Sequence, residues 1–284
     1  MDLRKHGRFG VCSQQIRLNH LEKVCRENDL LAWDKQTIPV KANLVVNEKF
    51  KIAYCPVLKA SSRTWRKYLL FATGLAKSFD DFDDQKFKSA FKELSQFSPT
   101  QQATILNTYT KFMVVRNPFQ RLESTWREKL ITTEQPYYRN TWGKVILSRY
   151  RGRYKPDDRV RFEEFVKYIV AGAKDLHWTG AMHTCQPCSV KYDYILRTET
   201  SLQNAGPVLE KLNMTVALPR YGLTRVDSNM TSAVMKDYAA VDEASIKQLL
   251  LRYNLDMEAF GYQFSAQNLT AKCSISQSDG EECC

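Results

Sequence analysis

A lysine and several small hydroxyl residues follow an apolar run, and this arrangement suits the binding of a phosphate or sulfate group. Lys59 ends the apolar run, and the residues after it would supply backbone N–H groups at the start of a helix. These N–H groups carry partial positive charge, and the lysine adds a full charge that can stabilise a leaving oxygen. The candidate anion-binding residues are Lys59, Ser61, Ser62 and Thr64, and Arg63 and Trp65 of the same stretch are further candidates for ligand binding.

Two elements must hold these side chains in place. The apolar run before Lys59 predicts a buried strand, and the stretch after it predicts a helix with one apolar face. The stretch contains no glycine, so it is not a Walker A loop. A buried strand followed by a surface helix with an incidental lysine is the alternative interpretation. The expected apolar face of the helix consists of Trp65, Tyr68, Leu69 and Ala72.

The same order of elements recurs over residues 109–130. An apolar strand ends at Arg116, Asn117 is the expected N-cap, and Pro118 takes the first helical position. Arg116 and Ser124, two turns into the helix, can both reach one phosphate, the arginine through its forked guanidinium. The expected buried face consists of Phe119, Leu122, Trp126 and Leu130, so that Arg121, Ser124 and Glu128 are expected to lie off it.

A block over residues 175–199 contains a candidate proton acceptor. His177 suits the removal of a proton from a hydroxyl group, because imidazole titrates near neutral pH. A working imidazole base predicts a rate that rises with pH through about 6–7. A structural role beside Trp178 is the alternative for His177. The other candidate bases are His183, Glu123 and Glu199.

The same block contains a candidate zinc constellation. Cys185 and Cys188, together with His177 and His183, are four plausible ligands. However, a single Cys-x-Pro-Cys motif lacks a second cysteine pair, and in an oxidising compartment such cysteines more often form disulfides. We therefore expect no metal.

Three blocks in this order resemble the Golgi carbohydrate sulfotransferases, in particular those of the chondroitin and dermatan 4-O type. Residues 58–67, LKASSRTWRK, are similar to the family's first signature for PAPS (3′-phosphoadenosine 5′-phosphosulfate). Residues 115–129, VRNPFQRLESTWREK, are similar to its second signature. Residues 175–195 are similar to its His-Trp, Cys-x-Pro-Cys and Tyr-Asp-Phe-Ile pattern. Leu58 and Arg63 depart from the proline and threonine of the family.

The resemblance implies a PAPS-dependent sulfotransferase that acts on a hydroxyl group of an acidic glycan. Lys59 and the helix start at residues 61–64 would hold the 5′-phosphosulfate, while Arg116 and Ser124 would hold the 3′-phosphate. Lys59 and His177 are then the expected catalytic residues, and the chemistry requires no metal. A nucleotide kinase or other P-loop enzyme is one alternative. A catalytically impaired glycan-binding pseudo-sulfotransferase is the other.

Length and composition fit one globular domain. The 284 residues are 43% hydrophobic, which is enough for one substantial core or two small ones, and one domain is the favoured count. We expect an α/β fold with a central, mostly parallel sheet and a P-loop-like strand-loop-helix at the cofactor, the sulfotransferase fold that the resemblance implies. The sulfotransferase domain is expected over residues 10–264, and the polar residues 265–284 are expected to be disordered.

The chain is basic, with 42 Lys and Arg residues against 31 Asp and Glu residues and a formal net charge of +11. This balance indicates an acidic partner, which can be nucleic acid, an anionic membrane or a polyanionic glycan, and charge alone does not choose among them. The lack of nucleic-acid-binding motifs disfavours nucleic acid. Tyrosines alternate with basic residues over 149–155, where Arg149, Arg151 and Arg153 are candidate glycan contacts. An ordinary solvated surface is the alternative. Glu199, after a predicted strand, is a further candidate for substrate binding.

The compartment is inferred from the resemblance. The resembled family are Golgi membrane proteins with an N-terminal anchor, whereas residues 1–10 contain no apolar run of the length that a signal peptide or membrane span needs. Sequons at Asn213, Asn229 and Asn268, and the eight cysteines, agree with the secretory route. We therefore expect the Golgi lumen or Golgi membrane, without a transmembrane segment in this chain.

Overall fold

The structure is a computed structural model that describes residues 3–30, 43–132, 136–200, 204–212 and 228–262. The chain divides into two compact units. The polar tail expected at residues 265–284 lies outside the described residues. The single domain expected over residues 10–264 stays a prediction. The sheet unit consists of Met1–Arg116, Ala181–Arg225 and Ile275–Cys284, and the helical unit consists of Asn117–Gly180 and Val226–Ser274.

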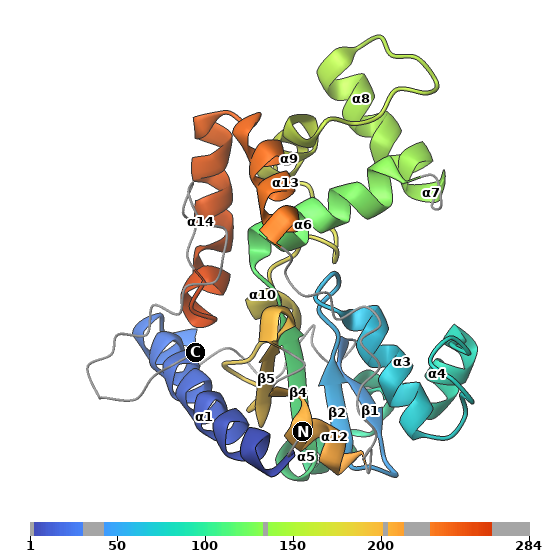
Figure 1. The fold of residues 1–284 in the computed structure, drawn as a ribbon, viewed down its shortest axis with the longest axis vertical. Helices are drawn as coiled ribbons and strands as arrows, with labels where there is room; N and C mark the ends of the chain where they lie inside the picture. Colours follow the sequence, from blue (N-terminus) through green and yellow to red (C-terminus); the bar gives the residue numbers. More distant parts are fainter. Residues whose placement is uncertain (1–2, 31–42, 133–135, 201–203, 213–227, 263–284) are drawn as a thin grey trace. The chain divides into compact units, whose positions relative to one another are not determined.

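The sheet unit contains a five-stranded sheet with the strand order β3-β1-β2-β4-β5 (Figure 1). Strands β2, β4 and β5 pair in parallel, whereas β1 pairs antiparallel with both β2 and β3. Four of these five strands therefore run in one direction, which confirms the α/β class and the mostly parallel sheet. The strands are β1 (Val45–Asn47), β2 (Ile52–Cys55), β3 (Lys92–Glu93), β4 (Thr110–Val115) and β5 (Tyr194–Arg197).

The parallel strands β2 and β4 form the centre of the core. All of β2 is buried, as are residues 111–115 of β4. Tyr54 stacks on its register partner Phe112 with ring centroids 4.5 Å apart, and Trp65 packs 5.0 Å from Phe112. Burial on both faces explains why these strands are continuous apolar runs. Their carboxyl ends lie at one edge of the sheet, where α/β folds bind their ligands.

Helices pack against this sheet. α1 packs against β5, where Arg17 Nη1 donates a hydrogen bond to the carbonyl oxygen of Ile195 (3.0 Å; Figure 1). The helix predicted after Lys59 is confirmed as α3, with Trp65, Tyr68 and Leu69 buried. The helices of the sheet unit are α1 (Leu3–Glu27), α3 (Ser62–Ala72), α4 (Asp84–Ala90), α5 (Pro99–Thr108), α10 (Ala181–Cys185) and α12 (Gly206–Lys211).

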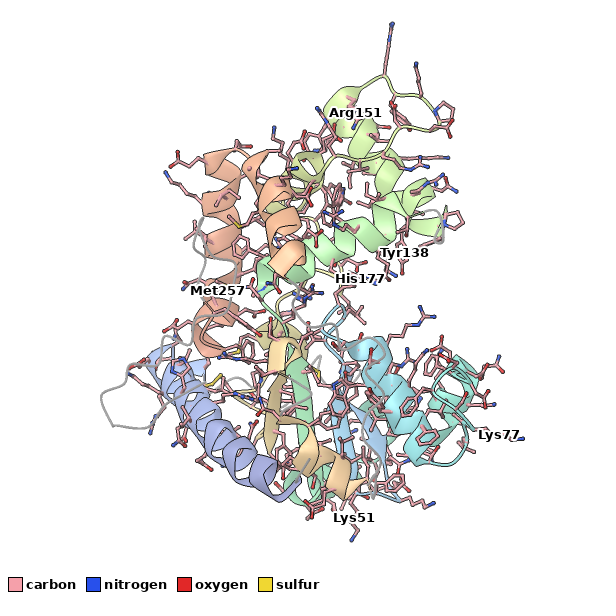
Figure 2. All side chains as sticks on the ribbon, viewed as in Figure 1. Lys51, Lys77, Tyr138, Arg151, His177 and Met257 are labelled. Atoms are coloured by element: carbon pink, nitrogen blue, oxygen red, sulfur yellow. A yellow bond between two sulfur atoms is a disulfide. The ribbon has the colours of Figure 1, made fainter. Side chains whose placement is uncertain are left out.

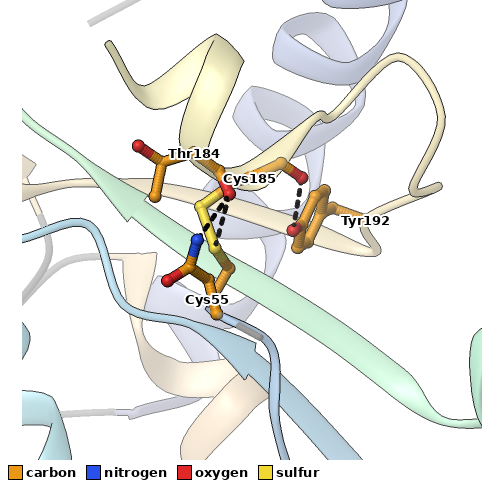
Figure 3. Close-up of a disulfide and its surroundings, with 5 residues drawn as sticks. Cys55, Thr184, Cys185 and Tyr192 are labelled. Atoms are coloured by element: carbon orange, nitrogen blue, oxygen red, sulfur yellow. Dashed lines mark hydrogen bonds between the residues drawn. A yellow bond between two sulfur atoms is a disulfide. The ribbon is translucent and has the colours of Figure 1, made fainter. Parts of the chain in front are cut away.

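Two disulfides bind the end of α10 and the turn after it to the rest of the sheet unit. Cys185 pairs with Cys55, the last residue of β2 (Figure 3), and Cys188 pairs with Cys25 of α1. The Tyr192 hydroxyl donates to the carbonyl oxygen of Cys185 (2.8 Å). Because Cys185 and Cys188 are disulfide-bonded, they cannot serve as zinc ligands, and the candidate zinc constellation is excluded.

Removal of the Cys55–Cys185 disulfide should destabilise the protein. The bond joins residues 130 positions apart, so it restricts the unfolded chain, and Cys55→Ala/Cys185→Ala should lower the free energy of unfolding by about 2–5 kcal/mol. Urea denaturation of the double variant and the parent measures the change. Cys25→Ala/Cys188→Ala, which removes a link over 163 residues, is the matched comparison and should lose a similar amount. A first double variant with the parent's urea midpoint would contradict this expectation.

The helical unit shows no strand among its described residues. Two buried tyrosine hydroxyls join its segments: Tyr238 donates to the carbonyl oxygen of Phe119 (2.8 Å), and Tyr253 to that of Trp178 (2.7 Å). None of the helices described in either unit is long and apolar enough to cross a membrane. The elements are α6 (Pro118–Trp126), the π-helical turn Arg127–Ile131, α7 (Pro136–Tyr138), the π-helical turn Arg139–Gly143, α8 (Lys144–Arg151), α9 (Phe162–Val170), α13 (Ser228–Ala239) and α14 (Glu243–Ala259).

Candidate active site

The loop between β2 and α3 turns sharply without glycine. Lys59 and Ser61 have φ angles of 68° and 57°, in the left-handed region that non-glycine residues rarely adopt. The Ala60 N–H donates to the carbonyl oxygen of Val57 (3.1 Å), which closes the turn. Residues in such sparsely populated conformations cluster at ligand-binding sites. Lys59 therefore adopts the left-handed backbone conformation that a glycine adopts in the corresponding turn of a P-loop.

The start of α3 is suited to an anion. Ser61 occupies the N-cap position, but its side chain makes no capping hydrogen bond, and the first turn contains no acidic residue. The first N–H groups of a helix have no partner within the helix, so a bound anion can accept their hydrogen bonds. The local geometry therefore agrees with the anion-binding role predicted for this segment.

The remaining residues of the first turn differ in their exposure. Ser62 and Thr64 are partly exposed, and Arg63 is exposed. Trp65 is fully buried, and its ring packs edge-on against Tyr68 with centroids 5.9 Å apart. This burial gives Trp65 a packing role in the core. Cofactor contact by any of these four predicted residues stays a prediction.

Arg116 reaches the loop from the neighbouring strand. Its Nη1 donates to the carbonyl oxygen of Lys59 (3.3 Å). Thr198, which follows β5, donates from Oγ1 to the carbonyl oxygen of Val115 (3.1 Å). The structure thus brings Lys59 and Arg116 together at the carboxyl edge of the sheet. Glu199 lies next to Thr198 in a single 3-10 turn and is partly exposed.

Ser124 belongs to the helical unit. The predicted N-cap of its helix is confirmed, because Asn117 Oδ1 accepts hydrogen bonds from the backbone N–H groups of Phe119 (3.0 Å) and Gln120 (3.5 Å). Ser124 is partly exposed, whereas its neighbour Thr125 is buried. Joint binding of one phosphate by Ser124 and Arg116 stays a prediction.

Arg121 does not lie off the buried face of α6, contrary to the sequence prediction. Only 1% of its surface is exposed, and its guanidinium donates to the carbonyl oxygens of His177 (3.3 Å) and Thr179 (2.6 Å). Helical periodicity predicts that a charged side chain at this position faces solvent. The Arg121 guanidinium can be buried because carbonyl oxygens of a distant segment accept its hydrogen bonds. Arg121 therefore holds the backbone at His177. Of the predicted apolar face, Phe119, Leu122 and Leu130 are buried and Trp126 is partly buried.

His177 is held by a carboxylate that the sequence analysis did not select. His177 Nδ1 lies 2.7 Å from Asp175 Oδ1, and the same oxygen accepts the backbone N–H of His177 (2.8 Å). The His177 side chain is 15% exposed. When Nδ1 donates to the carboxylate, Nε2 of the neutral ring carries the lone pair that accepts a proton. A carboxylate two residues before a candidate base is the sequence signal that could have found Asp175.

Glu123 is less suited to accept a proton. It is 2% exposed and forms an ion pair with Arg127, which also pairs with Asp237 (2.5 Å). This carboxylate is therefore committed to an arginine inside the helical unit. His183 is exposed on α10 of the sheet unit. Within the helical unit, the geometry favours His177 over Glu123 as the base.

The basic and aromatic cluster at residues 149–155 is partly structural. Arg151 forms a two-point ion pair with Glu164, with Nε–Oε1 and Nη2–Oε2 distances of 2.6 Å and 2.9 Å. Burial disfavours the charged form of Glu164, but hydrogen bonds from arginines outweigh it and hold the pKa of this carboxyl below its usual value. Arg149 and Arg153 are exposed. Arg151 thus serves an internal ion pair, whereas Arg149 and Arg153 stay candidate glycan contacts.

Comparisons with known proteins agree with these features. A model of the sulfotransferase family matches residues 42–263. Similar relatives are carbohydrate sulfotransferase 10 of Gallus gallus and carbohydrate sulfotransferases 8 and 9 of Homo sapiens, with 27%, 29% and 28% identity. The matches cover 87%, 88% and 88% of this chain but 74%, 59% and 60% of the relatives, so the chain spans about three fifths of the two human proteins. No solved structure matched the chain.

Proposed function

This chain belongs to the sulfotransferase family, and we propose that it transfers a sulfuryl group from PAPS to a hydroxyl group of a carbohydrate. The observation that carries the proposal is the loop before α3. In this loop Lys59 precedes the start of α3, the side chain of the N-cap residue Ser61 makes no capping hydrogen bond, and Arg116 donates a hydrogen bond to the Lys59 carbonyl oxygen. The names of the relatives support a carbohydrate acceptor. The net charge of +11 supports an acidic one, and a chondroitin or dermatan type is favoured.

Lys59 and the start of α3 would hold the 5′-phosphosulfate of the donor. When the bond between sulfur and the phosphate oxygen breaks, negative charge develops on that oxygen, and the Lys59 ammonium stabilises it. Arg116 and Ser124 would hold the 3′-phosphate, which distinguishes PAPS from ATP. Arg63 is exposed in the first turn of α3 and adds a cation where the resembled family has a threonine.

His177 would accept the proton of the attacking hydroxyl. The sugar oxygen forms its bond to sulfur as the bond from sulfur to phosphate breaks, and the hydroxyl proton passes to His177 Nε2. The Asp175 carboxylate, 2.7 Å from Nδ1, stabilises the imidazolium that results. The products are a sulfated sugar and 3′-phosphoadenosine 5′-phosphate (PAP).

The proposed compartment is the Golgi lumen or Golgi membrane. The two disulfides support an oxidising compartment, because disulfides are rare in the cytosol. Immunofluorescence of the protein as its own cells make it should show it in the Golgi, and a cytosolic signal would contradict this part of the proposal.

A glycan-binding pseudo-sulfotransferase is the second candidate, because Leu58 and Arg63 depart from the first PAPS signature. Transfer of labelled sulfate from PAPS onto desulfated chondroitin, dermatan, heparosan and N-glycan acceptors distinguishes the two. We expect transfer onto desulfated chondroitin or dermatan. Binding of these glycans without transfer to any of them would favour the second candidate.

The preference for the 3′-phosphate should depend on Arg116. We expect PAP to bind much more tightly than 5′-AMP, and Arg116→Ala to lose about 1.5–3 kcal/mol of PAP binding, the usual effect of losing a hydrogen bond to a charged group. Titration calorimetry with both nucleotides measures this. The 5′-AMP affinity serves as the internal control, because Arg116 also contacts the Lys59 carbonyl and damage to the loop would weaken both nucleotides. Arg149→Ala, at an exposed arginine, should change neither. Equal affinities of the parent for PAP and 5′-AMP would refute the PAPS assignment.

A further inference from the structure

Aromatic rings surround the imidazole of His177. The ring centroid of His177 lies 5.4 Å from that of Tyr138 and 5.7 Å from that of Trp142, both in edge-to-face geometry. The ring centroids of Tyr138 and Trp142 lie 4.7 Å apart, and those of Trp142 and Trp178 lie 4.6 Å apart. Edge-to-face contacts of this kind fix ring orientation. Tyr138 and Trp142 are therefore positioning residues for the candidate base.

Two exposed apolar side chains border this group. Tyr137 is 68% exposed and packs edge-on against Tyr138 with centroids 5.2 Å apart. Leu176, which directly precedes His177, is 49% exposed. Tyr137 and Leu176 are thus exposed apolar side chains next in sequence to Tyr138 and His177, where a bound acceptor could cover them. The ring of Tyr137 is of the size and polarity that suits the C–H face of a sugar.

One basic side chain of the same helical segment is not engaged by any residue of the described ranges. Arg139 follows Tyr138, is partly buried, and makes no ion pair or side-chain hydrogen bond with any residue of the described ranges. Lys129, by contrast, already has partners within the protein. Its Nζ lies 4.5 Å from the centre of the Tyr138 ring and 3.0 Å from Glu128 Oε1, with which it forms an ion pair. Arg139 is therefore the arginine whose charge a ligand at this place could neutralise.

We propose that Tyr137, Arg139 and Leu176 form an acceptor subsite that binds an acidic pyranose beside His177. The C–H face of the sugar stacks on Tyr137, and its carboxylate or sulfate pairs with Arg139. The subsite deepens the proposed function and rests on it for the role of His177. Burial, and then the charge of Asp175, raise the pKa of Tyr138, so this phenol keeps its proton and can donate a hydrogen bond to a sugar oxygen.

This subsite differs from the basic and aromatic cluster at residues 149–155. Figure 2 shows Arg151 well apart from Tyr138 and His177. A hydroxyl group must come within hydrogen-bond reach of the base that takes its proton. The reacting sugar therefore binds beside His177, and residues 149–155 can contact only more distant units of the same glycan.

The test compares Tyr137→Ala and Arg139→Gln with Tyr150→Ala and Arg149→Gln, which remove the same side-chain types from the cluster at residues 149–155 and should raise the acceptor KM less. The acceptors are a desulfated chondroitin hexasaccharide, which carries uronates, and a neutral hexasaccharide of N-acetylglucosamine. Tyr137→Ala should raise the acceptor KM about tenfold, and Tyr137→Phe should restore it. Arg139→Gln should raise the KM about 10- to 100-fold for the acidic acceptor only. The PAP affinity and the Tm should not change.

Two outcomes separate the subsite from the proposed function. If sulfate transfer occurs but Tyr137→Ala and Arg139→Gln leave the acceptor KM unchanged, the subsite is wrong and the proposed function stands. If the parent transfers no sulfate, calorimetry with the same chondroitin hexasaccharide decides. Weaker binding by Tyr137→Ala and Arg139→Gln would then support the subsite although the proposed function has failed. Equal binding by parent and variants, or no binding by the parent, would overturn the subsite.

Discussion

Replacing Lys59 by alanine should lower the rate of sulfuryl transfer by about 10²–10³-fold, the usual effect of removing one group that stabilises developing charge. In the proposed reaction the lysine acts on the leaving phosphate oxygen, so the loss should appear in kcat and not only in the KM for PAPS. Alanine and lysine both carry a Cβ atom, so the left-handed backbone at φ 68° is equally strained in both. The fold should therefore persist. Steady-state kinetics with labelled PAPS and thermal unfolding measure the two effects.

Lys51 offers a matched control for this substitution. It is an exposed lysine with a φ angle of 49°, and it lies just before β2, at the opposite end of the strand from Lys59. Lys51→Ala removes the same charge from the same kind of backbone, and it should leave kcat within about twofold of the parent. If Lys59→Ala melts normally and transfers sulfate at the rate of the parent, the role given to Lys59 is wrong.

Replacing His177 by alanine should lower kcat by roughly 10²–10⁴-fold, the usual effect of removing a general base. A neutral imidazole accepts the proton, so the parent's rate should rise with pH through about 6–7, and the variant should lose this rise. The pH dependence of kcat for the parent and variant measures both changes. His183→Ala, at an exposed histidine of α10, is the control and should change neither. If His177→Ala keeps the rate and the pH profile while Glu199→Gln loses them, the base is the carboxylate.

Asp175→Asn tests whether the carboxylate supports the imidazole. A carboxylate 2.7 Å from Nδ1 favours the protonated ring, so its removal lets His177 lose its proton at lower pH. The rising part of the pH profile should therefore move to lower pH. The kcat should also fall, but less than in His177→Ala, because a base remains. A profile that moves to higher pH would contradict the role given to Asp175.

The two strand-loop-helix stretches could be predicted because their signals are local. Buried parallel strands such as β2 and β4 are continuous apolar runs, and the helices after them show their period within a dozen residues. The cap at Asn117 depends only on the next three residues. The three blocks of resemblance then supplied the candidate roles of Lys59, Arg116 and His177, which local patterns alone could not assign.

The features that could not be predicted depend on contacts between distant segments or on backbone angles. Arg121 is buried because it bonds to carbonyl groups 56 and 58 residues further along the chain. The pairing of Cys55 with Cys185 spans 130 residues, and eight cysteines allow many alternatives. The left-handed angle at Lys59 has no sequence signal, because glycine is the residue that normally marks it. The edge strand β3 is two residues long, which is too short to show a period.

The positions of the disulfides set the order in which the protein can mature on the ribosome. Cys25 and Cys55 emerge 163 and 130 residues before their partners Cys188 and Cys185. At roughly 5–20 residues per second, the early cysteines wait about 6 to 30 s for those partners. During this interval Cys12, Cys25 and Cys55 are the cysteines already made, so any bond among them is non-native for Cys25 and Cys55. We therefore expect maturation to depend on thiol–disulfide exchange that removes such bonds. The loop between β2 and α3, which follows Cys55, gains its covalent anchor only when residue 185 has been made.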